Sequence, residues 1–255
     1  MMQLDYGNWV RKKILLILGL CALGMGALIF IPLGLAYQIV TTTLFVIVFV
    51  SFLFPFYAYI MFSQNGGKLQ EKIYNLAIQH LGKDLKGNFI DIGSGNGVLA
   101  IKLAQQHDFI EVTGIDYWGK DWEYSKSICE KNAQMVKVAN RVRFQKGDAA
   151  LLDFADNTFD GAISNLTFHE VKSVTDKKLV LQEALRVVKL GGSFSFVDYF
   201  FDEKYYGKES ELEQFQKDLN LTQFERKHLQ DVIVLPTILK HPKILGKVGI
   251  VFGKK

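Results

Sequence analysis

Residues 89–97 read FIDIGSGNG, an apolar run that carries one acid and opens into three glycines separated by small polar residues. Glycine has no Cβ and tolerates positive φ, so a ligand can lie directly against such a backbone. The residues that follow have helical spacing, so the loop is expected to join a strand to a helix. A glycine loop alone is weak evidence of function, because many such loops are plain turns.

After residue 66 the sequence alternates between short apolar runs and stretches with helical periodicity. This alternation predicts an α/β fold in which a parallel sheet is covered on both faces. The expected helices are 67–81, 97–106, 122–138, 175–188 and 208–219. The expected strands are 88–92, 110–115, 141–145, 159–164, 193–199, 223–229 and 247–253.

Acidic residues lie in or directly after the first three of these strands. Asp91 lies in the first, Asp116 ends the second, and Asp148 follows the third. Because ligands of an open α/β sheet bind beyond the carboxyl ends of the strands, the three acids are expected to surround one ligand. Asp116 is placed to accept hydrogen bonds from both hydroxyls of a ribose, and Asp148 to accept one from the exocyclic amine of an adenine.

The spacing of the glycines indicates the kind of ligand that the loop binds. A dinucleotide-binding loop reads G-x-G-x-x-G. Here the spacing is G-x-G-x-G with Asp91 just before it. An acid at the mouth of the loop disfavours a pyrophosphate and favours a cationic ligand, so a nucleotide-dependent oxidoreductase is the weaker interpretation.

Four segments together resemble the successive motifs of class I S-adenosylmethionine-dependent methyltransferases. They read FIDIGSGNGVLAIKLA, VTGIDYWG, KGDAALLDFADNTFDGAISNLTFHEV and EALRVVKLGGSFSFVDYF. The resemblance covers about residues 67–255 and is nearest to the group that includes the quinone-biosynthesis C-methyltransferases and similar small-molecule enzymes. It implies a Rossmann-like, seven-stranded sheet with an antiparallel last hairpin, and S-adenosyl-L-methionine as cofactor.

The resemblance also implies which residues hold that cofactor. Its methionine portion would lie among Asp91, Gly93, Ser94, Gly95 and Gly97, its ribose beside Asp116 and Tyr117, its adenine beside Asp148 and Ala149, and its methyl group beside Asn165.

Methyl transfer from a sulfonium is a direct displacement, so the protein's main task is to align the reacting atoms. A general base is needed only if the acceptor atom starts protonated. His169, in the segment Asn165-Leu-Thr-Phe-His-Glu170, is the candidate for that base. A packing or helix-start histidine is an equally good interpretation, and Glu170 either orients His169 or is simply solvated.

Other functions are disfavoured by what the sequence contains. The net charge of +4 is spread without a basic stripe, and no Pro-Pro-aromatic sequence follows Asn165, so nucleic acid is not an expected partner. The two cysteines, Cys21 and Cys129, belong to no metal-binding spacing and are expected to be free thiols. Nothing in the sequence indicates the oligomeric state.

The N-terminal part is uncharged over a long stretch between Lys13 and Lys68. Residues 14–36 and 39–62 are each long enough to cross a bilayer, which takes about 20 apolar residues in a helix. The sequence therefore predicts a two-helix transmembrane hairpin. A signal peptide, whose apolar core has about 7–15 residues, and a buried hairpin of a soluble protein are the rivals, and the length of the uncharged stretch argues against both.

Basic residues flank the two apolar segments and predict their orientation. They are Arg11, Lys12, Lys13, Lys68 and Lys72. Such flanks stay on the cytoplasmic side, so both termini and the catalytic part are expected to face the cytoplasm. The expected domains are a membrane anchor at 1–64 and a methyltransferase domain at 65–255.

The acceptor is expected to be a lipophilic small molecule, because the catalytic part is tied to a lipid bilayer and aromatic residues follow the second and fifth strands. These aromatics include Tyr117, Trp118, Tyr199, Phe200, Phe201, Tyr205 and Tyr206. Two alternatives stay open: a membrane-tethered methyltransferase of a protein or soluble metabolite, and a non-catalytic cofactor-binding scaffold. Residues 235–245 either lie on the membrane surface or form an ordinary connection before the last strand.

Overall fold

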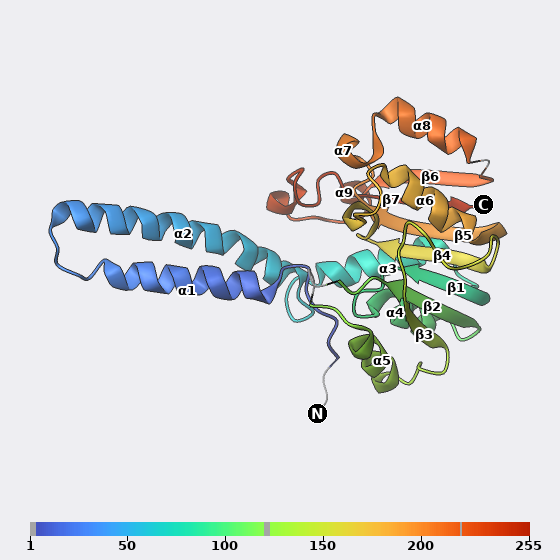
Figure 1. The fold of residues 1–255 in the computed structure, drawn as a ribbon, viewed down its shortest axis with the longest axis horizontal. Helices are drawn as coiled ribbons and strands as arrows, with labels where there is room; N and C mark the ends of the chain where they lie inside the picture. Colours follow the sequence, from blue (N-terminus) through green and yellow to red (C-terminus); the bar gives the residue numbers. More distant parts are fainter. Residues whose placement is uncertain (1–3, 120–122, 220) are drawn as a thin grey trace. The chain divides into compact units, whose positions relative to one another are not determined.

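The computed structural model describes residues 4–119, 123–219 and 221–255. The chain divides into two compact units (Figure 1). One is Asn8–Lys72, and the other takes the described residues before Asn8 together with Ile73–Lys255. The boundary expected between residues 64 and 65 thus falls inside the first unit, and the start of the chain belongs with the second.

The first unit contains two packed helices, α1 (Lys12–Leu28) and α2 (Leu35–Phe62). Glycines allow their close approach. A Cβ added at Gly19 would lie 3.6 Å from the ring of Phe52, and one added at Gly26 would lie 3.4 Å from the ring of Phe45. The two glycines are two helical turns apart, so they share the face of α1 that meets α2.

Among the described residues, one helix, α2, is long and apolar enough to cross a membrane. An 18-residue stretch of α2 has a mean hydropathy of 2.4, and 6% of that stretch is buried. A signal sequence near an N-terminus can have the same length and apolar composition. The expectation of two spanning helices at 14–36 and 39–62 is not supported for the first, because α1 has 17 residues and ends at Leu28. Pro32 has no N–H to donate and restricts the residue before it, which explains why the helix does not continue.

The second unit is built on a seven-stranded sheet with the order β3-β2-β1-β4-β5-β7-β6. The strands are β1 (Gly87–Ile92), β2 (Ile110–Asp116), β3 (Val142–Lys146), β4 (Phe159–Asn165), β5 (Val188–Asp198), β6 (Gln223–His228) and β7 (Gly249–Lys254). The first five strands pair in parallel, and β7 pairs antiparallel with both β5 and β6. The predicted seven-stranded sheet with an antiparallel last hairpin is confirmed.

Helices alternate with these strands, as the sequence pattern predicts. They are α3 (Leu69–Leu81), α4 (Val98–Gln106), α5 (Lys126–Met135), α6 (Lys177–Arg186), α7 (Glu203–Tyr206), α8 (Glu209–Asp218) and α9 (Leu229–Val232), with the 3₁₀ turns η1 (Phe168–Glu170) and η2 (Thr237–Lys240).

Another difference from the sequence prediction is at α5, which is expected at 122–138 and is observed at Lys126–Met135. Residue 122 lies outside the described residues, and the helix begins at Lys126. Its start is set by Ser125, whose side chain accepts a hydrogen bond from the Ile128 N–H and so satisfies one of the free donors of the first turn.

The strand order places the ligand edge of the sheet. From β1 the chain moves outward to β2 and β3, then returns to the other side of β1 with β4 and β5. The direction of winding therefore reverses between β1 and β4, and in open α/β sheets ligands bind beyond the carboxyl ends of the strands at such a point. Ile92 at the end of β1 is in register with Ser164 near the end of β4.

Candidate active site

The loop after β1 has the conformation that its glycines predict. Gly93, Gly95 and Gly97 have φ angles of +81°, +56° and +80°. At Gly93 the backbone is also crowded, because an added Cβ would lie 1.9 Å from the Oγ1 atom of Thr167, which follows β4. At Gly95 an added Cβ would meet the ring of Tyr124 at an ordinary 3.5 Å.

These two glycines make a matched pair of substitutions. Gly95→Ala is expected to lower the free energy of unfolding by about 1–2 kcal/mol, the cost of a left-handed conformation for an L-residue. Gly93→Ala is expected to lower it further, because the new methyl group must also displace Thr167. Urea unfolding of both variants in detergent micelles measures the difference, and equal losses would contradict the crowding at Gly93.

Asp91 lies in β1 beneath the loop and is 1% exposed. Its Oδ2 atom accepts a hydrogen bond from the Ala100 N–H at 3.0 Å. Its Oδ1 atom is buried, and among the described residues it has no hydrogen-bond partner. Burial raises the pKa of this carboxyl to about 7. A buried acceptor without a donor is unusual in a folded protein, and this one belongs to a residue that is separated from the glycine loop only by Ile92.

Asp116 ends β2 and holds the glycine loop. Its Oδ2 atom accepts from the Gly95 N–H at 2.8 Å, and its Oδ1 atom accepts from the Trp118 N–H at 2.7 Å. Burial raises the pKa of this carboxyl above its ordinary value. The Trp118 Nε1–H donates to the Gly95 carbonyl at 2.9 Å, so the indole also contacts the loop.

Tyr117 is not brought to this cluster. Its side chain is 65% exposed, and the Lys146 Nζ atom lies 4.9 Å from its ring centroid. A place beside the ribose therefore stays a prediction for Tyr117, and the structure puts Trp118 against the loop instead. Trp118 has a φ of +43°, a conformation that bulky residues seldom adopt outside functional sites.

The turn after β3 holds the two residues expected at the adenine. The Asp148 Oδ1 atom accepts from the Ala150 N–H at 2.9 Å, and Ala149 is buried in the core cluster. The turn is tied to β2 by the Gly147 N–H, which donates to the Asp116 carbonyl at 3.0 Å. Asp148 and Ala149 thus lie next to Asp116, as a shared adenosine site requires.

Asn165 ends β4 beside the glycine loop. Its Oδ1 atom is buried and, within the described part of the chain, has no hydrogen-bond partner. The next residue, Leu166, has a strained φ of +51°, and Thr167 then turns back so that its Oγ1 contacts the Gly93 carbonyl at 3.4 Å. Like Asp91, Asn165 presents an unpaired acceptor near the bare loop.

The sequence patterns did not indicate that the start of the chain also reaches this loop. Asn132 on α5 is buried; its side chain accepts from the Asp5 N–H at 3.1 Å and donates to the Asp5 carbonyl at 2.9 Å. The same amide group donates to the Asn96 carbonyl at 3.1 Å. Residues just before the first apolar helix are therefore tied, through Asn132, to the glycine loop.

His169 lies on η1, after β4, and pairs with an acid that sequence reasoning missed. Its Nδ1 atom is 3.0 Å from Oδ1 and 3.2 Å from Oδ2 of Asp198, the last residue of β5. Asp198 is 1% exposed and also accepts from the backbone N–H of Tyr199 at 2.6 Å. The signal for Asp198 was present in the sequence, because it is one more acid at the end of a strand.

Two effects oppose each other in the pKa of His169. Burial lowers it, but the negative charge and hydrogen bond of Asp198 raise it by more, so the pKa lies above its ordinary value. With Nδ1–H donated to Asp198, the Nε2 atom is the one left to accept a proton. Glu170 is about half-exposed, and its carboxylate lies 3.6 Å from Nε2.

Aromatic side chains line His169. The ring centroids of Tyr199 and Tyr205 lie 4.6 Å and 5.7 Å from that of His169. The other aromatics after β5 have different places: Phe200 and Tyr206 are fully buried in the core, and Phe201 stacks on His228. Two of the aromatics expected near the acceptor are thus at the candidate base.

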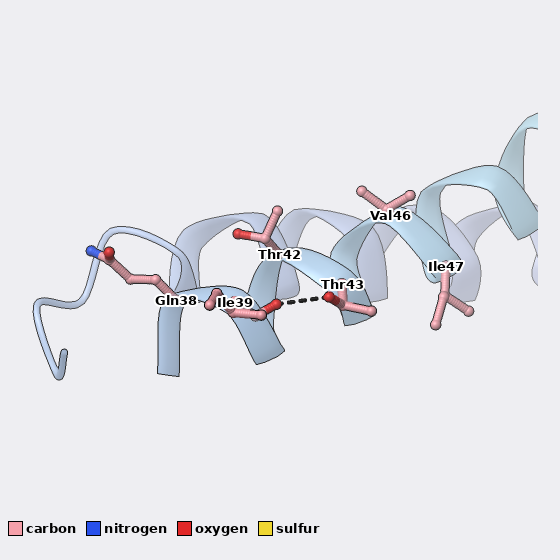
Figure 2. Close-up of a pocket in the computed structure, with 6 residues that line it drawn as sticks. All are labelled: Gln38, Ile39, Thr42, Thr43, Val46 and Ile47. Carbon is pink, nitrogen blue, oxygen red and sulfur yellow. Dashed lines mark hydrogen bonds between the residues drawn. The ribbon is translucent and has the colours of Figure 1, made fainter. Parts of the chain in front are cut away.

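A separate hollow lies on α2, with a volume of about 480 Å³. Figure 2 shows its lining, in which the Thr43 hydroxyl donates to the Ile39 carbonyl at 2.8 Å. It is lined by Gln38, Ile39, Thr42, Thr43, Val46 and Ile47. It contains none of the predicted site residues and is an open face of an apolar helix.

Comparison with known proteins identifies the family. A family model described as a methyltransferase domain matches residues 83–238, which is more than half of the chain. The chain belongs to the class I S-adenosylmethionine-dependent methyltransferases. This confirms the resemblance drawn from the four sequence motifs, and S-adenosyl-L-methionine is the cofactor of the family.

Curated methyltransferases of several kinds are similar to this one. The 27-O-demethylrifamycin SV methyltransferase of Amycolatopsis mediterranei is 30% identical over 50% of this chain and 44% of its own. The ubiquinone/menaquinone biosynthesis C-methyltransferase of Geotalea daltonii is 27% identical over 44% of this chain and 46% of its own. The methyltransferase chain thus spans about half the length of the curated relatives it matches.

A solved structure shares the fold. Geranyl diphosphate C-methyltransferase from Streptomyces coelicolor, solved with S-adenosyl-L-homocysteine, superimposes with a TM-score of 0.55 and 13% identity. The match covers 74% of this chain and 81% of that one.

The residues at the ligand edge fit the family's cofactor. The loop at Gly93–Gly97 has the positive φ angles that glycine tolerates, and the buried acid Asp91 is suited to the cofactor's ammonium group. Asp116 ends the neighbouring strand, where a ribose would lie. The unpaired acceptor of Asn165 adds a polar contact on the β4 side.

Proposed function

We propose that this methyltransferase is held at a membrane and methylates an ionisable hydroxyl group on a lipophilic small molecule. The observation that carries the proposal is the pair His169–Asp198, which lies at the carboxyl ends of β4 and β5 with Tyr199 and Tyr205 around it. Histidine held by a buried carboxylate is a common arrangement for a general base. Similarity to O-methyltransferases adds support.

Asp198 and His169 have different roles in the proposed proton transfer. Asp198 accepts the Nδ1–H of His169, which keeps Nε2 free to take the proton of the acceptor hydroxyl. When bound, S-adenosylmethionine supplies an electrophilic methyl group on a positively charged sulfur. Transfer of that methyl group would break its bond to sulfur and form one to the acceptor oxygen, and His169 would later return the hydroxyl proton to water.

The aromatic rings favour a planar, apolar acceptor. Tyr199 and Tyr205 pack against His169 and against each other, with tyrosine ring centroids 5.9 Å apart, so a planar acceptor would pack against this aromatic cluster. A phenolic hydroxyl has a pKa near 10 in water, so a base whose own pKa is raised is better matched to it than ordinary histidine.

The membrane part of the proposal rests on the apolar helices. In this proposal α2 crosses the bilayer and α1 packs beside it through Gly19 and Gly26. Lys68 and Lys72, the basic residues after α2, favour the cytoplasm for the side on which α2 ends. A lipid-soluble acceptor would then be concentrated at the membrane that holds the enzyme.

Labelling tests the proposal directly. Membranes containing the full chain are incubated with S-adenosylmethionine labelled in the methyl group, and lipid extract, protein and aqueous fractions are counted separately. We expect label in a small molecule of the lipid extract, and none with the Asp116→Ala variant. Label confined to protein or to the aqueous fraction would reject a lipophilic acceptor, and cofactor binding by calorimetry without any transfer would indicate a non-catalytic scaffold.

A further inference from the structure

The connection between β6 and β7, residues 229–248, lies at the same edge of the sheet as the catalytic pair. Gly249 at the start of β7 is in register with both Asp198 at the end of β5 and His228 at the end of β6. The Tyr199 hydroxyl, beside His169, donates to the Ile244 carbonyl at 2.6 Å. Figure 1 shows this connection, coloured orange to red, extending beyond the ends of β5 and β7.

Side chains of the β6–β7 connection divide into an inner and an outer set. Leu235, Leu239 and Leu245 are buried and anchor it to the domain. Val234 and Ile238 point outward and are 89% and 51% exposed. Exposed apolar side chains mark an interaction surface where they gather together, and these two lie four residues apart in one anchored connection.

The connection carries one acidic residue, Asp231, and its basic residues are Lys240, Lys243 and Lys247. Between residues 232 and 248 the sequence has no acidic residue. Lys247 pairs with Asp202 at 3.1 Å. Lys240 and Lys243 are exposed, and they form no ion pair with any residue in the described part of the chain. Two outward apolar side chains therefore lie close in sequence to two unpaired positive charges.

We infer that the β6–β7 connection docks on the surface of an anionic lipid bilayer. Val234 and Ile238 enter the boundary between headgroups and acyl chains, and Lys240 and Lys243 bind phosphate oxygens of the headgroups. The inference rests on the proposed membrane anchoring by α2, which keeps the second unit within reach of a bilayer. Charge complementarity selects anionic lipid over a neutral surface.

Docking of this connection has a consequence for the acceptor. Tyr199 contacts both the connection, through Ile244, and the candidate base His169. A bilayer that meets Val234 and Ile238 is therefore close to the acceptor side of the active site. A lipid-soluble acceptor would reach His169 from the bilayer without crossing water.

A fluorescence experiment on the full chain in nanodiscs tests the docking. In a Cys21→Ser background, Val234→Cys carries an environment-sensitive fluorophore, while the native Cys129 is buried and unreactive. The nanodiscs contain phosphatidylglycerol, phosphatidylcholine and a nitroxide-bearing lipid as quencher. Leu190→Cys, at an apolar position that is 81% exposed near the start of β5, is the matched control.

We expect quenching at position 234 and none at position 190. Replacing Lys240 and Lys243 together with glutamine is expected to shift the docking equilibrium by about thirtyfold, because each basic residue near an anionic surface contributes about a factor of five. Equal quenching at 190 and 234, no quenching at 234, or no effect of the glutamines would overturn the inference. If quenching at position 234 is absent, a protein partner would become the better candidate for this surface.

The methyl-labelling assay on the same nanodiscs separates this inference from the proposed function. Transfer of label into the lipid extract without quenching at 234 would reject the docking and leave the proposed reaction standing. Quenching at 234 without any transfer would support the docking and reject the proposed reaction.

Discussion

Asp91→Asn is expected to weaken S-adenosylmethionine binding by roughly a hundredfold and yet to stabilise the ligand-free protein at pH 8. The binding loss is expected because the variant lacks the carboxylate that we assign to the cofactor's ammonium group. The gain in stability follows from removing a buried charge, since Asp91 is 1% exposed and its Oδ1 has no partner within the described residues.

The pH dependence of this effect has a definite sign. The pKa of Asp91 is raised from 3.8 to about 7 in the folded protein, mainly by burial. Between these values the folded state binds more protons than the unfolded state, so stability is highest at low pH and falls as pH rises towards 7. Above pH 7 the ionised carboxylate costs the fold on the order of 4 kcal/mol, and Asp91→Asn removes that cost.

Thermal unfolding measures the stability of the protein, and calorimetry measures its affinity for the cofactor, both over pH 5 to 9. Wild-type affinity for the cofactor should fall below about pH 7, because Asp91 then takes up a proton. Asp153→Asn, at an exposed position, is the control and should change neither property. A variant Asp91→Asn that binds cofactor normally would rule out the assigned role of Asp91.

His169→Ala is expected to slow methyl transfer by roughly a hundred- to ten-thousandfold while leaving cofactor affinity unchanged. The reason is that in the proposed reaction Nε2 of His169 takes the acceptor's proton and does not bind the cofactor. Initial rates of label incorporation into the lipid extract, with calorimetry beside them, measure the two effects. An unchanged rate would show that His169 is a packing residue.

Asp198→Asn tests the positioning of that base. The charge of Asp198 raises the pKa of His169, so without it the rise of rate with pH should move to lower pH. The rate itself should fall, because asparagine no longer fixes Nδ1 as the protonated nitrogen. Glu170→Gln is the control: its side chain is half-exposed, so a small change is expected. A pH profile that does not move would assign Asp198 a purely structural role.

Much of the fold could be predicted from residues 67–255, because the information is local. The spacing at which apolar residues recur distinguishes a strand from a helix within a few residues. The carboxyl ends of parallel strands all lie at one edge of the sheet. The positions of Asp91, Asp116 and Asn165 follow from that rule alone. It also applied to Asp198, but its partner His169 lies on the turn after another strand, β4, and the sequence gives no distance between the two residues.

Helix length in the apolar N-terminal part could not be read from composition. Residues 14–36 are apolar throughout, yet α1 ends at Leu28, before Pro32. Hydropathy measures only transfer to an apolar phase, while the end of a helix depends on backbone donors and on proline geometry. One helix, α2, therefore meets the length criterion among the described residues where two were expected.

The sequence by itself determined the α/β sheet, the glycine loop and the acids that surround it, because strand alternation and glycine conformations are properties of short segments. Only the tertiary structure decided that Asp198 holds His169, that Asn132 ties the start of the chain to the loop, and that Trp118 rather than Tyr117 contacts it. Those contacts join residues far apart in the chain, and they form only when strand register and helix packing place the side chains within hydrogen-bonding distance.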